Sequence, residues 1–255
     1  LYDSIRGDDF ALSSNLTDDE YNYSTHPNGD LSPTFLSNGF QTPSVTNNGI
    51  NRNTGTYVAW CWKAADTTTT ISAGTVGNTI ASDVRANQDA GFSIVKWTGT
   101  GANATVGHGL SSAPELILLR PLERDSNWFV YNSTIGNTEY LMLNRNFGSA
   151  SAVNIWNNTS PTSSVFSLTG YIDTNGLDED IIAYCFHSVD GYQKVGYFNQ
   201  VSGTTTVSTG FEPRFLMIKR TDNTGDWTVF DHLRSNGDAA LYANSSIQEQ
   251  PTTGY

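Results

Sequence analysis

Short apolar blocks recur along the chain about every 8–14 residues, and Gly, Asn, Ser and Thr fill the intervals between them. Blocks of this length, rich in β-branched and aromatic residues and bounded by turn residues, are typical of strands. No stretch carries a convincing helical period. The pattern therefore predicts an all-β fold of antiparallel β-sandwich type. Its main predicted strands are residues 57–62, 92–97, 116–119, 128–132, 139–143, 165–168 and 181–186.

Many of these blocks belong to an internal repeat. The segment 128–133 (WFVYNS) returns as 227–232 (WTVFDH) and, shortened, as 1–4 (LYDS). Three further pairs of segments align: 114–120 with 213–220, 59–62 with 183–186, and 39–40 with 170–171. A period of about 100 residues predicts sandwich modules built on one plan. Repetition also favours binding or building over a unique catalytic residue, so we expect no enzyme.

The repeat divides the chain into four parts. Residues 1–66 match the C-terminal half of a first repeat, 91–190 form one complete sandwich repeat, and 191–255 begin a further, truncated repeat. Residues 67–90 are Thr- and Ala-rich and weakly hydrophobic, which indicates an insertion or an inter-repeat linker. Because both ends fall inside a repeat, we expect the chain to be an internal piece of a longer polypeptide.

The balance of charged residues limits the classes of partner that the chain can bind. Thirteen Lys and Arg against twenty-five Asp and Glu give a net charge of −12. Nucleic acid and anionic membrane surfaces need basic residues, so neither is an expected partner. No apolar run approaches the ~18 residues of a membrane span, and we expect no membrane insertion.

The two cysteines, Cys61 and Cys185, occupy equivalent places in two repeats, each inside an apolar run. Equivalent positions in separate copies belong to separate cores, so we expect two buried free thiols. A disulfide between them is the alternative.

One loop concentrates oxygen ligands before a predicted strand. Asp173, Asn175, Asp178 and Asp180 surround Gly176, and calcium takes six to eight oxygen ligands. The spacing of an EF-hand is absent. The sequence thus predicts no cofactor and a solvated acidic turn at this loop, with bound calcium as the alternative.

A second loop combines an aromatic ring with amides. Trp156, Asn157 and Asn158 lie in a polar segment, and sugars bind to such mixtures by stacking and hydrogen bonding. They are the candidate carbohydrate-binding residues, unless Trp156 folds back onto the sandwich. Paired carboxylates at 18–20 and 178–180 lie in turn-like sequence without aromatic residues around them, a weak basis for a glycosidase.

Several motifs resemble those of one family. They are the segments 90–95 (AGFSIV), 98–101 (TGTG), 106–110 (VGHGL), 156–166 and 183–186 (AYCF), with 2–7 (YDSIRG) and 36–40 (LSNGF). This set is similar to repeat domains in large virion proteins of tailed, especially marine, bacteriophages, and covers most of the chain outside 67–90. The resemblance implies concanavalin A-like, lectin-type or jelly-roll sandwiches in tail fibres and other appendages.

The resemblance implies a virion structural protein on the particle surface, most simply a tail fibre or appendage segment that contacts host-surface polysaccharide. Its partners would be other virion proteins and further copies of itself, with a trimer compatible with a fibre. Two alternatives remain open: a purely structural capsid decoration, cement or fibre-shaft module without a ligand, and a secreted bacterial adhesin.

Overall fold

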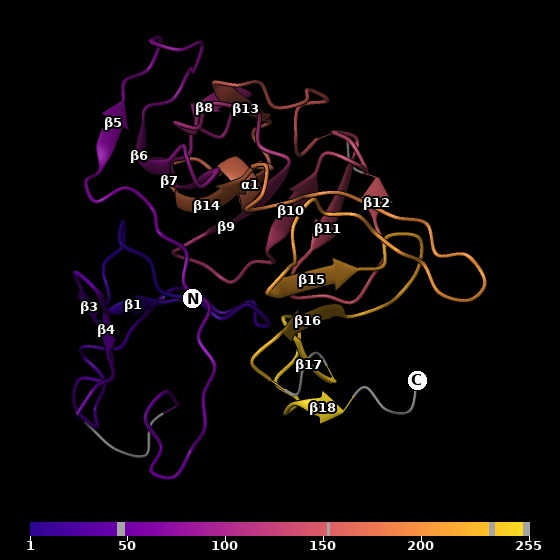
Figure 1. Ribbon diagram of the computed structural model, residues 1–255. Coiled ribbons are helices and arrows are strands. Elements are labelled where there is room, and N and C mark those ends of the chain that lie inside the picture. Colours follow the sequence, from indigo (N-terminus) through magenta and orange to yellow (C-terminus); the bar gives the residue numbers. More distant parts are fainter. Residues whose placement is uncertain (45–48, 152–153, 235–237, 252–255) are drawn as a thin grey trace.

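The apolar run at residues 116–121 forms β9 (Leu116–Pro121), a strand inside an antiparallel sheet of order β12-β11-β10-β9-β14-β7-β6-β5. The computed structural model describes all residues except 45–48, 152–153, 235–237 and 252–255. The other strands of this main sheet are β5 (Thr69–Ile71), β6 (Ser82–Asn87), β7 (Phe92–Thr98), β10 (Phe129–Asn132), β11 (Glu139–Met142), β12 (Ala150–Ser151) and β14 (Asp180–Phe186). Figure 1 shows them at the top of the molecule.

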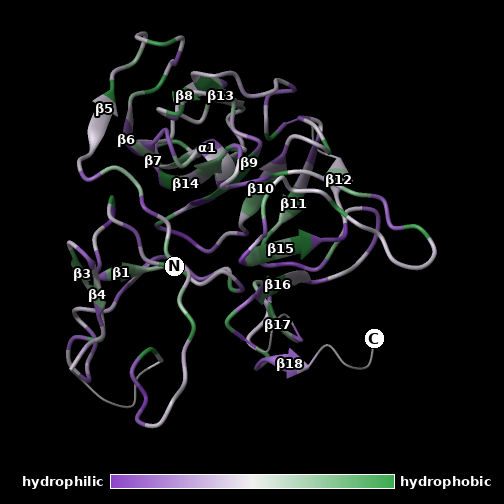
Figure 2. Cartoon of the chain, viewed as in Figure 1, coloured by the Kyte–Doolittle hydropathy of each residue, from purple (hydrophilic) through white to green (hydrophobic). Residues whose placement is uncertain are grey.

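Both faces of the main sheet are covered, because alternate residues of its central strands point to opposite sides. Ile117 and Leu119 belong to one buried cluster, and Leu118 belongs to the other. We call the face with Ile117 and Leu119 the outer face and the opposite one the inner face. The outer face is covered by the strand pair β8 (Ala104–Gly107) and β13 (Val165–Leu168). The short helix α1 (Ile172–Asn175) follows β13. Figure 2 shows hydrophobic residues along β9, β10 and β14.

The inner face is covered by the two ends of the chain. Leu12 and Trp227 join Ile94, Trp128 and Ile182 in the second buried cluster. Leu12 belongs to the first copy of the repeat (residues 1–66), and Trp227 belongs to the third (residues 191–255). The middle copy (residues 91–190) therefore lies between its two partial relatives.

The remaining strands form three smaller antiparallel sheets. They are β1 (Phe10–Ala11) with β2 (Tyr21–Asn22), β3 (Thr34–Leu36) with β4 (Gly39–Gln41), and the four-stranded sheet β15 (Phe215–Lys219), β16 (Trp227–Asp231), β17 (Ala239–Tyr242) and β18 (Gln250–Pro251).

One pattern of strand pairing recurs in these sheets. Leu118 pairs with Val130 in the middle copy, as Met217 pairs with Val229 in the third. The pairing of β11 with β12 returns in β17 with β18, and in β1 with β2. The aligned residues differ by 99 along β9 and β10 and by 100 from β17 onward. The third copy therefore has one residue more than the middle copy, placed after β16.

Several expectations need correction. The fold is mostly β, with antiparallel sheets and one short helix. The described residues form a single domain and do not divide into separate modules of about 100 residues. Residues 67–90 are no linker, because β5 and β6 extend the main sheet. Residues 57–62 form no strand. Cys185 is buried as expected, but Cys61 in that segment is exposed.

Candidate functional site

The structure does not present Trp156 to a ligand. Its side chain is 1% exposed, packs against Tyr131 at 5.6 Å between ring centroids, and donates its indole N–H to Glu139 O at 3.1 Å. The polar loop folds back onto the sheet because the indole completes the outer-face core. Asn157 and Asn158 stay near the surface with left-handed backbone (φ 49° each), so the sugar-stacking prediction at this loop is wrong in its central residue.

The candidate calcium loop is held by cations and amides of the protein itself. Asp173 pairs with Arg124, and Asp180 pairs with Lys96 at 2.7 Å. Asn175 is buried and donates to Ala102 O at 2.7 Å, while Asp178 lies in the turn with φ 61°. Desolvation opposes ionisation of Asp180, but hydrogen bonds from Lys96 and Thr98 outweigh it and lower its pKa. In the described part of the chain, no group of three or more His, Cys, Asp or Glu residues could hold a metal ion.

The contacts between copies repeat from one junction to the next. At the first junction, between the first and middle copies, Trp128 Nε1 donates to Ser13 O at 2.8 Å. At the second junction, between the middle and third copies, Trp227 Nε1 donates to Met142 O at 2.8 Å. Because Ser13 aligns with Met142, as Tyr2 aligns with Tyr131, both junctions use the same pair of positions.

Backbone hydrogen bonds are duplicated in the same way. Ser126 N donates to Thr17 O at 2.8 Å, and the aligned Gly225 N donates to Asn146 O at 2.8 Å. In the opposite direction, Glu20 N donates to Leu122 O at 2.8 Å, and the aligned Ser149 N donates to Thr221 O at 2.7 Å. The two junctions therefore share one docking geometry.

A basic side chain occupies the same place in both junctions. Arg120 is fully buried and donates to Thr17 O and Asp18 O at 3.0 and 2.6 Å. The aligned Lys219 reaches Asn146 O at 3.4 Å. Burial lowers the pKa of Arg120 to about 10, while the negative charges of Asp18, Asp19 and Asp125 act in the opposite direction.

The first junction also encloses a hollow of about 340 Å³. Its walls combine two tyrosines with three carboxylates and a hydroxyl, namely Tyr21, Tyr23, Asp18, Asp19, Asp125 and Ser13, next to Ala11 and Leu16. The rings of Tyr21 and Tyr23 meet edge to face at 4.7 Å, and Tyr21 is 45% exposed. This hollow is the candidate functional site.

The second junction provides an internal comparison, because it has the same geometry with different residues. The positions of Asp18, Asp19 and Tyr21 are held there by Phe147, Gly148 and Ala150, and that of Asp125 by Thr224. The shared docking geometry therefore does not require carboxylates or tyrosine. Their presence at the first junction alone marks it as the specialised one.

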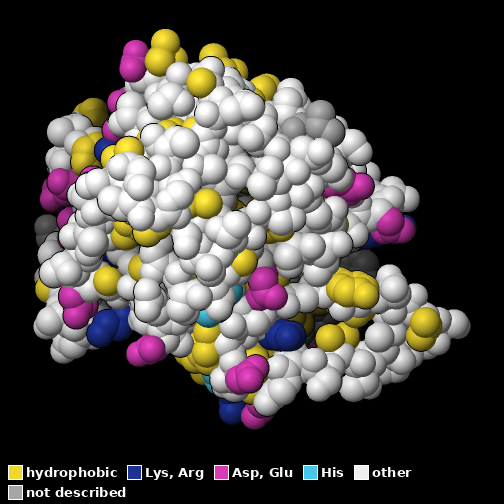
Figure 3. All heavy atoms as spheres, turned by 90° about the horizontal axis from the view of Figure 1, so that it is seen from above, with side chains coloured by type: hydrophobic (Ala, Val, Ile, Leu, Met, Phe, Trp, Pro, Cys, Tyr) yellow, Lys and Arg dark blue, Asp and Glu magenta, His cyan; other side chains and the backbone are white. Residues whose placement is uncertain are grey.

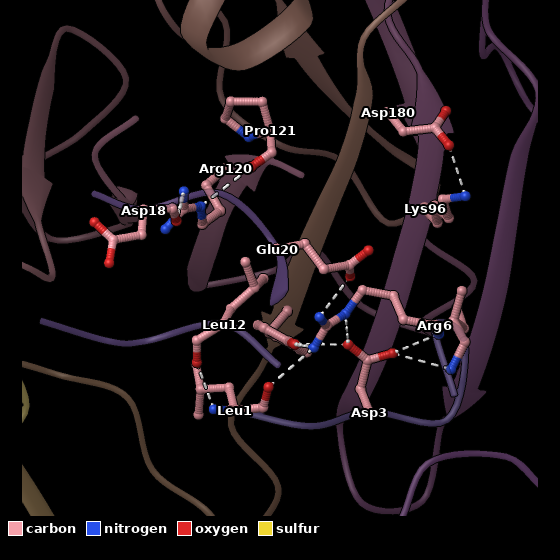
Figure 4. Close-up of polar contacts among 12 residues, drawn as sticks. Leu1, Asp3, Arg6, Leu12, Asp18, Glu20, Lys96, Arg120, Pro121 and Asp180 are labelled. Atoms are coloured by element: carbon pink, nitrogen blue, oxygen red, sulfur yellow. Dashed lines mark hydrogen bonds and ion pairs between the residues drawn. The ribbon is translucent and has the colours of Figure 1, made fainter. Parts of the chain in front are cut away.

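A cluster of ion pairs holds a loop in place in the first copy, and an aligned cluster does so in the third. Arg6 pairs with Asp3 at 2.5 Å and with Glu20 at 2.7 Å (Figure 4). Tyr184 of the main sheet donates to Asp3 at 2.7 Å. Burial raises the pKa of Tyr184, and the negative charge of Asp3 adds to this.

The third copy repeats that cluster. Arg234 pairs with Asp231 at 2.6 Å and Glu249 at 2.8 Å, and its guanidinium lies 5.9 Å from the ring centre of Trp60. Trp60 aligns with Tyr184. The third copy therefore contacts the first through aligned residues, and all three copies touch one another.

The residues of the hollow were partly visible in the sequence. Residues 18–20 are a carboxylate cluster, and Tyr21 and Tyr23 follow at alternate positions, which point to the same side of an extended chain. The sequence does not reveal the opposite wall of the hollow, because Asp125 belongs to a loop of the middle copy more than 100 residues away.

No helix in the described residues is both long and apolar enough to span a bilayer. No curated protein and no solved structure matches the chain. A family profile does match, over residues 1–254. The chain thus belongs to the family described as a domain of unknown function, DUF7483.

Proposed function

We propose that this protein is a non-enzymatic structural segment of a tailed-phage virion, built on concanavalin-like sandwich modules, that contacts host-surface glycan at an appendage. The sequence resemblance supports the location on the particle surface. The observation that carries the glycan contact is the hollow of tyrosines and aspartates at only one of two equivalent junctions.

The chemistry of the hollow suits sugars. Aromatic rings stack on the apolar faces of sugar rings, and carboxylates accept hydrogen bonds from hydroxyl groups. The net charge of −12 and the three aspartates disfavour acidic polysaccharides, so the proposed ligand is a neutral glycan. On the face shown in Figure 3, charged groups are scattered among uncharged atoms. Weak sites on many copies of one particle give useful avidity.

A binding screen tests this proposal. The purified chain is applied to an array of neutral and acidic bacterial polysaccharides, with and without calcium. We expect saturable binding to neutral glycans that calcium does not change and that Tyr21→Ala and Asp19→Asn each weaken at least tenfold. Phe147→Ala is the matched control, because Phe147 is 61% exposed and takes the place of Asp18 at the second junction.

If no glycan on the array binds saturably, the proposed contact with glycan is overturned. The second candidate, a decoration, cement or shaft module without a ligand, would then be preferred. The duplicated junctions and the burial of Trp156 favour that candidate. Immunogold electron microscopy of phage particles that contain the chain distinguishes a tail appendage from the capsid surface.

A further inference from the structure

The outer face of the third copy lacks the cover that the middle copy has. In the middle copy, Ile117 and Tyr131 are buried under β8 and β13, and Phe166 of β13 is 1% exposed. The aligned residues of the third copy are Leu216 on β15 and Phe230 on β16. Leu216 is 41% exposed, and Phe230 is partly exposed. The same residue types that form a core in one copy thus lie at the surface in the other.

The strand edge next to this face carries no strand pairing in the described residues, although the rings of Trp60 and Trp62 lie 5.6 Å from the ring of Phe215 on β15. In the middle copy, β9 pairs with β10 on one side and with β14 on the other. Within the described part of the chain, β15 pairs only with β16. An apolar face beside an unpaired strand edge is a surface that promotes association. Figure 2 shows that β15 is hydrophobic along its length.

The chain carries the matching cover elsewhere. The offset that aligns Gly39 with Gly170 also aligns Phe35 with Phe166, so the hairpin β3–β4 corresponds to the covering strand β13. This hairpin has no core of its own, because all six residues of its two strands are exposed, including Phe35, Leu36 and Phe40. Figure 1 shows this hairpin at the left edge of the molecule, apart from β15.

We propose that the outer face of β15 and β16 binds the β3–β4 hairpin of a second copy of this chain. The middle copy is the template, since its β13 buries Phe166 against the face that β15 and β16 reproduce. Face and hairpin are different surfaces, so the contact is head-to-tail and builds a closed ring or a filament. The inference does not depend on glycan binding, and each can fail without the other.

Charge substitutions at the two exposed surfaces test this contact. Light scattering coupled to size-exclusion chromatography, over a range of protein concentrations, should show association of the unaltered chain. Leu216→Asp and Leu36→Asp should each weaken it at least tenfold. The control is Leu177→Asp, because Leu177 is 67% exposed and belongs to neither surface. A chain that stays monomeric at all concentrations, or a control variant as impaired as the other two, would overturn the proposal.

Cross-linking identifies the two surfaces without adding charge. One chain carries Leu36→Cys and a second carries Leu216→Cys, both with Cys61→Ser, and a short bismaleimide is added to the mixture. We expect a cross-linked dimer whose peptides join positions 36 and 216. The chain with both cysteines, held at high dilution, is the counter-test. A cross-link within that single chain would show that the hairpin covers its own third copy and would overturn binding of a second copy.

Discussion

The indole nitrogen of Trp128 donates a hydrogen bond to the carbonyl oxygen of Ser13 at 2.8 Å, across 115 residues of chain. The same bond joins Trp227 to Met142 at the second junction. A docking contact that returns with the same donor, acceptor position and distance belongs to the repeat itself. Removing it should therefore weaken the attachment of one copy to the next.

We expect Trp128→Phe to lower the free energy of unfolding by about 1–3 kcal/mol, because Ser13 O loses its donor inside a buried contact. Trp227→Phe should act in the same direction. Urea unfolding followed by circular dichroism measures both. Tyr197→Phe is the control, with an expected change within about 0.5 kcal/mol, since the Tyr197 side chain is 73% exposed. Equal losses in all three variants would refute a special role for the junction tryptophans.

The ion pair of Arg6 should be more important for stability than its counterpart. The side chains of Arg6 and Asp3 are 1% and 2% exposed, against 13% and 6% for Arg234 and Asp231. We expect Arg6→Met to cost about 3–5 kcal/mol, because it leaves Asp3 buried without its cation.

Arg234→Met should cost less, because water reaches its partner more easily. Thermal unfolding of both variants against the unaltered chain measures the difference. The reverse order of stability would contradict the role of burial in the Asp3–Arg6 cluster.

A buried histidine should make stability depend on pH. His108 accepts from Leu110 N at Nδ1 and lies 3.1 Å from Thr162 O at Nε2, which fixes a neutral ring with its proton on Nε2. Burial lowers the pKa of His108 to about 4, the hydrogen bond to Thr162 opposes this, and His187 adds to it. The unfolded chain keeps a pKa near the ordinary 6.5.

Between those two values the unfolded state binds the extra proton, so stability falls as the pH drops from about 6.5 toward 4. The contribution of His108 to this loss is about 3 kcal/mol. Urea unfolding between pH 4 and 7 should show a shallower slope for His108→Gln than for the unaltered chain. Identical slopes would remove His108 as the cause.

The two thiols should react at very different rates. Burial raises the pKa of the Cys185 thiol, and its side chain is fully buried, whereas Cys61 is exposed. A thiol reagent such as dithionitrobenzoate should titrate one group in the native chain and two in urea. Cys61→Ser should abolish the native reaction. A native count of two or none would contradict the placement of these residues.

Much of the local structure was determined by the sequence alone. The apolar blocks at 92–97, 116–119, 128–132 and 181–186 become β7, β9, β10 and β14, because short, nearly continuous apolar runs bounded by turn residues favour strands buried on both faces. The aligned segments 128–132 and 227–231 form strands with the same pairing register. Repeated sequence gave repeated hairpins, since pairing between neighbouring strands depends on nearby residues.

The tertiary structure decided which of these surfaces meet. Residues 57–62 have the pattern of β14 but form no strand. β14 pairs with both β9 and β7, whereas residues 57–62 meet β15 through ring contacts of Trp60 and Trp62 with Phe215, at 5.6 Å each. Trp156 lies in a polar loop yet is buried, because the outer-face core offers its ring a contact with Tyr131 and its N–H a carbonyl. The acidic loop near Asp180 is neutralised by Lys96 and Arg124 of distant segments. The hollow also joins Tyr21 to Asp125, from opposite sides of a junction. Each of these outcomes depends on contacts between residues far apart in the chain, and the local sequence pattern does not specify such contacts.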